Sequence, residues 1–318
     1  MDKLIRSLHH VTSTVNDAQQ DFDFYTKLLG LRLVKQTVNF DNHHVYHFYY
    51  GNEAGTPSTI MTTFPYKGWN VPLGRKGAGQ IRVTSFSVPA GALEFWQRRL
   101  RERGMDVGDA EPRFGEEAIA FTDPSGLVLE LVAAVGDART PWVTSEVGAE
   151  HAIRGLHGVT MLIRSPARTL DLLTQVLGFE VVNQGPSRAR LATNGAIPGR
   201  LIDIVHAPEA PGAVNGLGTV HHVAMAIDDA EEQLRMRAEL VRLGYQVTEV
   251  RDRQYFRSIY FREPGGVLFE IATVPPGFTV DESLPCLGLE LKLPPWEEPH
   301  RAEIEAKLPR LSSPGARA

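Results

Sequence analysis

Two histidine doublets, His9-His10 and His221-His222, lie at matching places in two apolar runs of the chain. Side chains alternate between the two faces of a strand, so His10 and His222 share one face. Alternation by itself turns His9 and His221 to the other face. Glu270 lies in a third apolar run, where a carboxylate needs a partner to offset its burial. The residue types and their spacing therefore predict a metal site.

Two imidazoles and one carboxylate form the ligand set that suits non-haem Fe(II), with open positions for a substrate and dioxygen. We predict that His10, His222 and Glu270 bind Fe(II), and the same donors would also tolerate Mn(II). A single strand histidine is more often a hydrogen-bonded interior residue than a ligand. The matched register of the doublets and the charge in an apolar strand favour the metal site here.

The elements that must position these ligands repeat four times along the chain. Each repeat opens with a β-branched run, continues with apolar residues at helical spacing, and carries a glycine where the helix would end. The opening runs are residues 8–15, 81–88, 156–163 and 220–227, and the helical stretches are 21–29, 92–103, 167–177 and 230–243. The pattern predicts an α+β fold built from four βαβββ modules.

Comparison of the four modules limits the metal site to the first and the last. A gapless alignment puts Arg82 of the second module and Gly158 of the third at the place of His10 and His222. If the first and fourth modules face each other, one cavity collects the three ligands. Metal-dependent isomerases built from this repeat would need a second carboxylate from the closing strand of the first module, and Met61 and its neighbours do not supply one.

Other candidate ligands have simpler interpretations. Glu130 closes the second module and is expected to pair with a basic neighbour, and His157 is expected to be a hydrogen-bonded strand residue. His43, His44 and His47 are interleaved with aromatic residues, a pattern more typical of packing than of ligation. We expect these three histidines in the core or in a pocket wall.

Tyr260 and Arg253 lie in a polar stretch shortly before Glu270. Tyr260 could donate a hydrogen bond to a metal-bound oxygen, and Arg253 could hold an anionic substrate or intermediate. An exposed arginine is also often only a solvated surface charge. Both interpretations stay open on the sequence alone.

The composition is that of a folded globular chain. The 318 residues are 42% hydrophobic and 22% charged, and the net charge is −5, so no broad basic field awaits nucleic acid. No apolar run is long enough to span a membrane, and the first residues lack the apolar core of a signal peptide. The single cysteine, Cys286, fits a reducing compartment. We predict a cytoplasmic protein that binds neither nucleic acid nor membrane.

The chain is expected to divide into two tandem halves and a tail. A polar link separates an N-terminal domain of two modules, residues 1–140, from a C-terminal domain of two modules, residues 150–275. Residues 276–318 are rich in proline and are expected to form an extended strap over the surface with a loose end. The sequence assigns this tail no chemistry.

These features resemble the vicinal oxygen chelate superfamily, which includes glyoxalases, bleomycin resistance proteins and extradiol dioxygenases. The resemblance rests on the four βαβββ units, the histidine doublets and the phrase Pro264 to Glu270. It implies two tandem domains with cup-shaped mixed sheets. The chain resembles the hydroquinone-type ring-cleaving dioxygenases of that superfamily most in residues 7–12, 55–65, 113–115, 218–222 and 265–270, and the similarity extends over roughly residues 7 to 293.

The resemblance implies an Fe(II) enzyme that opens a hydroquinone ring with O2, between a hydroxyl-bearing carbon and its neighbour. The metal ligands of that family fall on the same three residues that the strand register selects. Its pocket residues fall on His9, Thr12, His221, Arg253 and Tyr260. By this resemblance, His9 and Thr12 line the substrate pocket, and His221, Tyr260 and Arg253 are catalytic. The partners are a small aromatic substrate and O2, and homo-oligomers are common in the superfamily.

Two other classes of function stay open on the sequence. A catechol-type extradiol dioxygenase or a glyoxalase-like lyase would keep the triad and change the substrate, and a lyase would consume no oxygen. A non-catalytic binding or resistance protein would use the cavity to hold an aromatic compound, and there we expect a degraded triad. The triad of this chain is complete.

Overall fold

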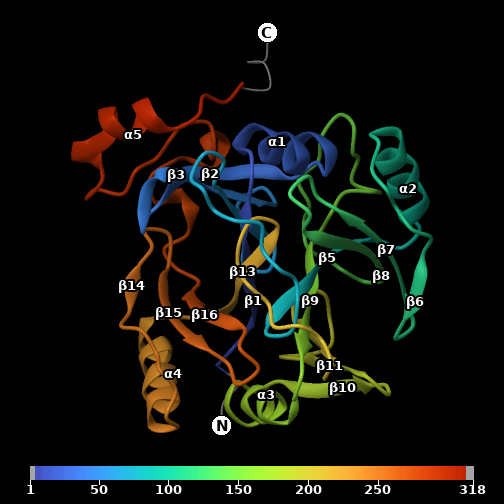
Figure 1. The fold of residues 1–318 in the computed structure, drawn as a ribbon. Helices are drawn as coiled ribbons and strands as arrows, with labels where there is room; N and C mark the ends of the chain where they lie inside the picture. The colour runs from blue at the N-terminus through green and yellow to red at the C-terminus, as the bar shows by residue number, and fades with distance from the viewer. Residues whose placement is uncertain (1–3, 313–318) are drawn as a thin grey trace.

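The computed structural model describes residues 4–312, and the strands within them form two eight-stranded mixed sheets. Both sheets are strongly curled, and helices lie around them (Figure 1). The predicted α+β class and the four βαβββ modules are confirmed.

Sheet I is built from the first and fourth modules. Its strands are β1 (Ser7–Val15), β2 (Arg32–Asn39), β3 (Asn42–Gly51), β4 (Ile60–Pro65), β13 (Thr219–Ile227), β14 (Arg251–Asp252), β15 (Arg257–Arg262) and β16 (Leu268–Thr273). Their order is β14-β15-β16-β13-β1-β4-β3-β2. The opening strands β1 and β13 pair antiparallel at the centre, and each pairs in parallel with its own closing strand. The first and fourth modules therefore share one sheet, as the metal site requires.

Sheet II unites the second and third modules in the same way. Its strands are β5 (Gln80–Pro89), β6 (Glu111–Arg113), β7 (Glu116–Thr122), β8 (Val128–Ala134), β9 (Gly155–Ile163), β10 (Glu180–Gln184), β11 (Arg188–Ala192) and β12 (Leu201–His206). Their order is β10-β11-β12-β9-β5-β8-β7-β6. Each sheet thus takes one module from each half of the chain. The predicted link near residues 140–150 is irregular chain between β8 and β9, and the division into two domains at that link stays a prediction.

One helical segment follows the opening strand of each module. The segments are α1 (Ala18–Asp23) with η1 (Phe24–Leu28), α2 (Leu93–Glu102), α3 (Ala167–Asp171) with η2 (Leu172–Val176), and α4 (Ala230–Arg242). The two η segments are π-helical turns. The predicted terminal glycines Gly30, Gly104, Gly178 and Gly244 all have positive φ, between 71° and 88°. Glycine adopts this conformation without the steric cost that a side chain imposes, so the helix ends are confirmed.

The tail after residue 275 lies along sheet I. A strap over the surface was predicted, but the tail is not extended throughout. It contains the 3-10 turns η3 (Phe278–Val280), η4 (Leu284–Cys286) and η5 (Glu298–His300), followed by α5 (Arg301–Lys307). Ion pairs from Arg301 to Glu298 and to Glu305 support this last helix, which the sequence analysis did not predict. The loose end falls on residues 313–318, outside the described residues.

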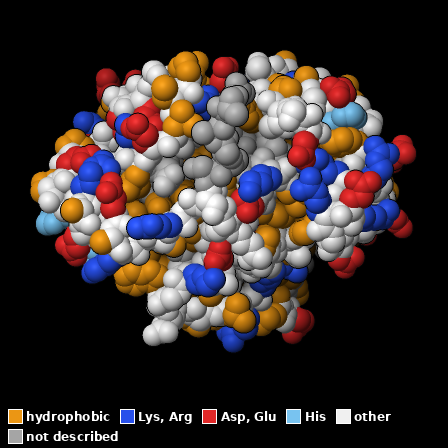
Figure 2. Space-filling model, turned by 90° about the horizontal axis from the view of Figure 1, so that it is seen from above, with side chains coloured by type: hydrophobic (Ala, Val, Ile, Leu, Met, Phe, Trp, Pro, Cys, Tyr) orange, Lys and Arg blue, Asp and Glu red, His pale blue; other side chains and the backbone are white. Residues whose placement is uncertain are grey.

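A continuous cluster of buried apolar side chains joins the two sheets and the helices that cover them. No helix within residues 4–312 is long and apolar enough to cross a membrane. On the face shown in Figure 2, basic and acidic side chains lie beside one another, which agrees with the small net charge of −5.

Candidate metal centre and substrate cavity

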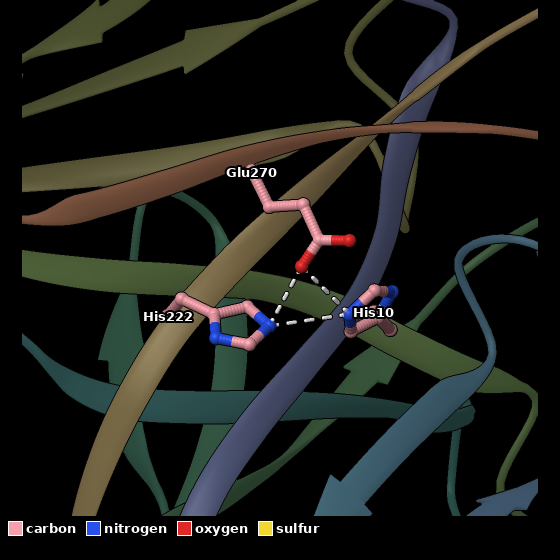
Figure 3. Close-up of side chains that lie close together, drawn as sticks. All are labelled: His10, His222 and Glu270. Carbon is pink, nitrogen blue, oxygen red and sulfur yellow. Dashed lines mark hydrogen bonds and ion pairs between the residues drawn. The ribbon is translucent and has the colours of Figure 1, made fainter. Parts of the chain in front are cut away.

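The centre of sheet I brings three predicted ligands together from three strands. His10 lies on β1, His222 on β13 and Glu270 on β16, and all three are buried (Figure 3). Glu270 Oε2 lies 2.8 Å from His222 Nε2 and 3.4 Å from His10 Nε2, and the two Nε2 atoms are 3.3 Å apart. The predicted grouping of two imidazoles and one carboxylate is present.

The three donor atoms fit a single divalent cation. A metal ion about 2.1 Å from each of two adjacent ligands holds them roughly 3 Å apart. Ser258 donates a hydrogen bond to Glu270 Oε1. Glu270 Oε2 is buried between the two imidazoles, and its contacts with them are ion pairs that lack regular hydrogen-bond geometry. A buried carboxylate oxygen that makes no regular hydrogen bond is costly unless a cation binds there.

Charges at this centre favour an ionised Glu270 carboxylate and a neutral His222 imidazole. Burial by itself would raise the pKa of Glu270, but His10 and His222 outweigh it and hold that pKa well below its usual range. Burial lowers the pKa of His222, and Glu270 opposes this only in part. Ionised carboxylate and neutral imidazole are the forms that coordinate metals.

Two β-bulges decide where the outer histidines of the doublets lie. In the antiparallel pairing of β1 with β13, the register skips His9 on one strand and His221 on the other. A bulge inserts one extra residue and re-aims its side chain. Simple alternation, which turns both residues away from the metal site, therefore does not hold at these two positions.

Each outer histidine contacts the neighbouring ligand through the nitrogen remote from the metal site. The Nδ1 atoms of His9 and His10 are 2.8 Å apart, and so are those of His221 and His222. Burial, together with the adjacent ligand, lowers the pKa of His9 and of His221 to about 3. The two outer rings are thus neutral near pH 7.

A cavity of about 400 Å³ opens beside the three ligands. Its wall includes the predicted catalytic residues His221, Arg253 and Tyr260. His9 and Thr12, predicted for the substrate pocket, are buried and do not belong to this wall. Further wall residues are Thr14, Asn39, Phe40, Asp41, His47, Tyr49, Phe64, Tyr66, Thr248, Arg251, Phe256 and Leu268.

Arg253 links Tyr260 to the hairpin between β2 and β3. Its Nε donates to the Tyr260 hydroxyl at 3.1 Å, and its Nη2 lies 3.1 Å from Asp41 Oδ2. Burial, followed by the charge of Glu270, raises the pKa of Tyr260. The phenol therefore stays protonated and can donate a hydrogen bond into the cavity.

His47 was expected in the core or in a pocket wall, and it lies in the cavity wall. Its Nε2 is 2.9 Å from Thr62 Oγ1, and its Nδ1 is 3.0 Å from the Tyr49 hydroxyl. Thr62 in turn donates to Thr12 Oγ1 at 2.8 Å. Thr12 thus supports the wall from behind through Thr62.

The sequence analysis did not identify Asp41 as a residue of the cavity. Its sequence signal is weak, because an aspartate in a loop has many other uses.

The corresponding place in sheet II contains no imidazole pair. The pairing of β5 with β9 skips Arg82, so Val83 and not Arg82 stands where sheet I has His10. Gly158 occupies the place of His222. In this superposition Asp203, opposite Thr160, takes the place of Glu270, and Glu130, opposite Ser85, takes that of Thr62. Glu130 is the equivalent of Glu270 within its own module, and its two oxygens accept hydrogen bonds from Arg113 at 3.0 and 2.6 Å. The expected structural role of Glu130 is confirmed, because a guanidinium neutralises it where sheet I offers a cation site.

His157 also has the role expected for a structural residue. Its Nε2 lies 2.8 Å from Glu116 Oε1 in sheet II. It thus pairs within the second sheet and makes no contact with the three predicted ligands.

Comparison with known families agrees with the repeated architecture. The family model described as "Glyoxalase/Bleomycin resistance protein/Dioxygenase superfamily" matches residues 7–131 and again residues 155–271. The two matched segments each contain two of the four modules.

Individual proteins resemble nearly the whole chain. MhqO of Bacillus subtilis (strain 168), which carries the name of a ring-cleaving dioxygenase, is 46% identical over 97% of both chains. The chlorohydroquinone/hydroquinone 1,2-dioxygenase of Sphingobium indicum is 36% identical over 94% of this chain and 95% of its own. A crystal structure of a Bacillus subtilis subsp. subtilis str. 168 protein named as a dioxygenase superposes with a TM-score of 0.92 at 45% identity, and the alignment covers 98% of both chains.

Proposed function

Because the chain belongs to the Glyoxalase/Bleomycin resistance protein/Dioxygenase superfamily, we propose that it opens hydroquinone rings with O2 at an Fe(II) centre. His10, His222 and Glu270 hold the iron in this proposal, and Mn(II) is the second candidate. The names of two similar proteins, a ring-cleaving dioxygenase and a hydroquinone 1,2-dioxygenase, support the substrate class.

The observation that carries the proposal is that the first module has Thr62 at the position where the fourth module has Glu270. In β13–β16, Glu270 pairs with Ala224, and the matching pair in β1–β4 is Thr12 with Thr62. Thr62 thus stands where a fourth, anionic ligand would complete the site, and its hydroxyl is engaged by Thr12 and His47. Three protein ligands leave coordination positions for a substrate and dioxygen.

When bound, Fe(II) supplies the electron transfer between the aromatic ring and dioxygen that lets a ring carbon react. The side chains of the cavity supply hydrogen-bond donors. A neutral His222 whose Nε2 faces the cation carries its proton on Nδ1 and donates to His221 Nδ1. The proton of neutral His221 is then on Nε2, so His221 acts as a donor.

Tyr260 and Arg253 complete a donor-rich wall beside the metal centre. The Tyr260 hydroxyl accepts from Arg253 and keeps its own proton for the cavity. Asp41 orients the guanidinium from the far side. Donors fixed in advance stabilise negative charge that develops on substrate oxygens. We therefore assign His221, Tyr260 and Arg253 to stabilisation of the hydroquinone oxyanion.

His9 differs from His221 in what it faces. Its ring hydrogen-bonds to His10 and to the backbone carbonyl of Thr273, and it lies outside the cavity wall. It is thus a positioning residue that fixes the tautomer and orientation of His10. Outer partners of this kind typically contribute 10- to 100-fold to metal affinity or activity.

Oxygen uptake tests the proposed function. Protein loaded anaerobically with Fe(II) is given hydroquinone, a substituted hydroquinone, catechol or no substrate, and product spectra are recorded. We expect uptake with the hydroquinones to exceed that with catechol. Uptake with catechol alone would shift the assignment to a catechol-type extradiol dioxygenase. No uptake by iron-loaded protein would overturn the proposal in favour of a lyase or a binding protein.

A further inference from the structure

A second histidine-carboxylate cluster lies away from the cavity, between sheet I and the tail. His43 and His44 are the second and third residues of β3, and Glu303 lies on α5, about 260 residues later in the chain. One donor atom from each of these residues lies within 4.8 Å of the others. Figure 1 shows α5 beside β3 at one end of sheet I. We define these three residues as the tail cluster.

We propose that the tail cluster binds a zinc ion that joins the C-terminal tail to sheet I. Two imidazoles with carboxylates suit Zn²⁺, whereas Mg²⁺ and Ca²⁺ prefer oxygen ligands alone. The tail cluster shares no residue with the centre formed by His10, His222 and Glu270, so this site does not depend on the proposed function.

The hydrogen bonds of the cluster already hold its donors in place. His44 Nε2 lies 3.2 Å from Glu303 Oε1, and His43 Nδ1 lies 2.7 Å from Glu297 Oε2. Glu297 is thus a further carboxylate beside the three donors. His300, whose ring centroid is 5.9 Å from that of His43, is a further imidazole within reach. Three donors from two distant segments thus form the tail cluster, and a further carboxylate and a further imidazole lie next to His43.

The surroundings keep the donors oriented and accessible. The ring of His44 stacks on Trp69, with 14° between the planes and 6.2 Å between the centroids. The side chains of His43 and His44 are 30% and 15% exposed, so a cation can reach them from solvent. The Tyr46 hydroxyl donates to the carbonyl of Pro309 and fixes the chain after α5. Prior orientation of this kind lowers the cost of binding an ion.

The position of the cluster gives zinc a structural consequence. His43 and His44 follow directly on the hairpin whose Asp41 contacts Arg251 and Arg253 at the cavity. A zinc ion held by His43, His44 and Glu303 would therefore tie the tail to the segment that orients Arg253.

Zinc stoichiometry tests the site. Metal-free protein is equilibrated with zinc under a competing chelator, and bound zinc is measured by elemental analysis. We expect two zinc ions per chain in the wild type, one in the tail cluster and one in the cavity. Glu303→Gln and His44→Gln should each lose one ion or weaken its binding at least ten-fold. Glu290→Gln, which changes an exposed carboxylate of the tail outside the cluster, is the control and should still bind two.

A second background separates the two metal sites. Glu270→Gln should retain one zinc ion, and in this variant zinc should slow hydrogen exchange in residues 297–308 at least ten-fold. Glu270→Gln combined with Glu303→Gln should show neither effect. The inference is overturned if Glu303→Gln and His44→Gln bind as much zinc as wild type with unchanged affinity. If Glu270→Gln alone still binds two ions, the cavity ligands are wrong, but the tail cluster stands.

Discussion

Single residues decide whether the cavity of sheet I can hold a metal. His10, His222 and Glu270 could be selected from the sequence because strand alternation and an out-of-place charge identify them without knowledge of the fold. Their chemistry leads to a direct test. His10→Ala and Glu270→Gln should each lose stoichiometric iron and lower oxygen uptake by more than about 100-fold, since removal of a ligand exceeds the loss of an outer partner.

Iron analysis and oxygen uptake on the same samples check this prediction. The control is Glu130→Gln, at the matching carboxylate of the second module. Glu130 pairs with Arg113 and not with a metal ion, so this variant should retain iron. Iron and activity retained in both ligand variants would refute the assignment of the metal centre.

Tyr260 carries a separate prediction at the residue scale. Tyr260→Phe removes the one hydroxyl that Arg253 orients toward the cavity, without disturbing a ligand. We expect kcat with hydroquinone to fall by about 100- to 1,000-fold, the range for a lost donor at a developing charge, with iron content unchanged. Steady-state oxygen uptake and metal analysis measure the two quantities. A kcat within two-fold of wild type would remove Tyr260 from the mechanism.

At the scale of the elements, the sequence predicts strands and helices better than it predicts their irregularities. The four helices and their terminal glycines follow from apolar spacing and backbone preference. The bulges at His9 and His221 do not, because an extra residue in a strand leaves no mark in a local pattern. The sequence alignment of the second module with the first was also wrong by one residue, because it put Arg82 at the place of His10, where the structure has Val83. Register depends on the partner strand, which the sequence does not name.

The contacts of Glu116 on β7 with His157 and Arg190 in sheet II predict that the free energy of unfolding depends on pH. Burial would raise the pKa of Glu116, but hydrogen bonds and charges of His157 and Arg190 outweigh it and lower the pKa to about 2. A carboxyl with a depressed pKa in the folded state adds stability above its unfolded pKa, and this is lost as pH falls from about 4.5 toward 2. Since Glu116 is partly exposed, we expect about 1–2 kcal/mol at pH 7.

Urea unfolding of Glu116→Gln between pH 3 and pH 7 measures this contribution. The difference from wild type should be largest at pH 7 and shrink toward pH 3. Glu111→Gln, an exposed carboxylate on the adjacent strand β6, is the control and should follow wild type at every pH. A difference for Glu116→Gln that does not change with pH would mean that packing and not charge is responsible.

At the scale of the whole molecule, the pairing of modules explains why, among the described residues, four repeats give a single candidate metal centre within the two sheets. Each sheet joins a module from the first half to one from the second half, so residues more than 200 positions apart meet at the β1–β13 seam. The sequence could identify the modules, but it could only assume which of them face each other. The position of the tail was harder to predict from the sequence, because prolines indicate an irregular path but do not indicate where that path lies on the molecule.

The tail is held to sheet I by a buried ammonium group, and this gives the last prediction. The side chain of Lys35 on β2 is fully buried and pairs with Asp281 and Glu282 of the tail. Removal of the partners of a buried charge typically costs about 3–5 kcal/mol, because the remaining charge is uncompensated. Asp281→Asn with Glu282→Gln should therefore lower the free energy of unfolding by that amount, and further addition of Lys35→Met should restore it to within about 1 kcal/mol. Urea unfolding of the wild type and the two multiple variants decides the matter. A triple variant as unstable as the double variant would show that apolar contacts of the tail, such as those of the buried Phe278 and Leu287, and not the ion pairs, hold it in place.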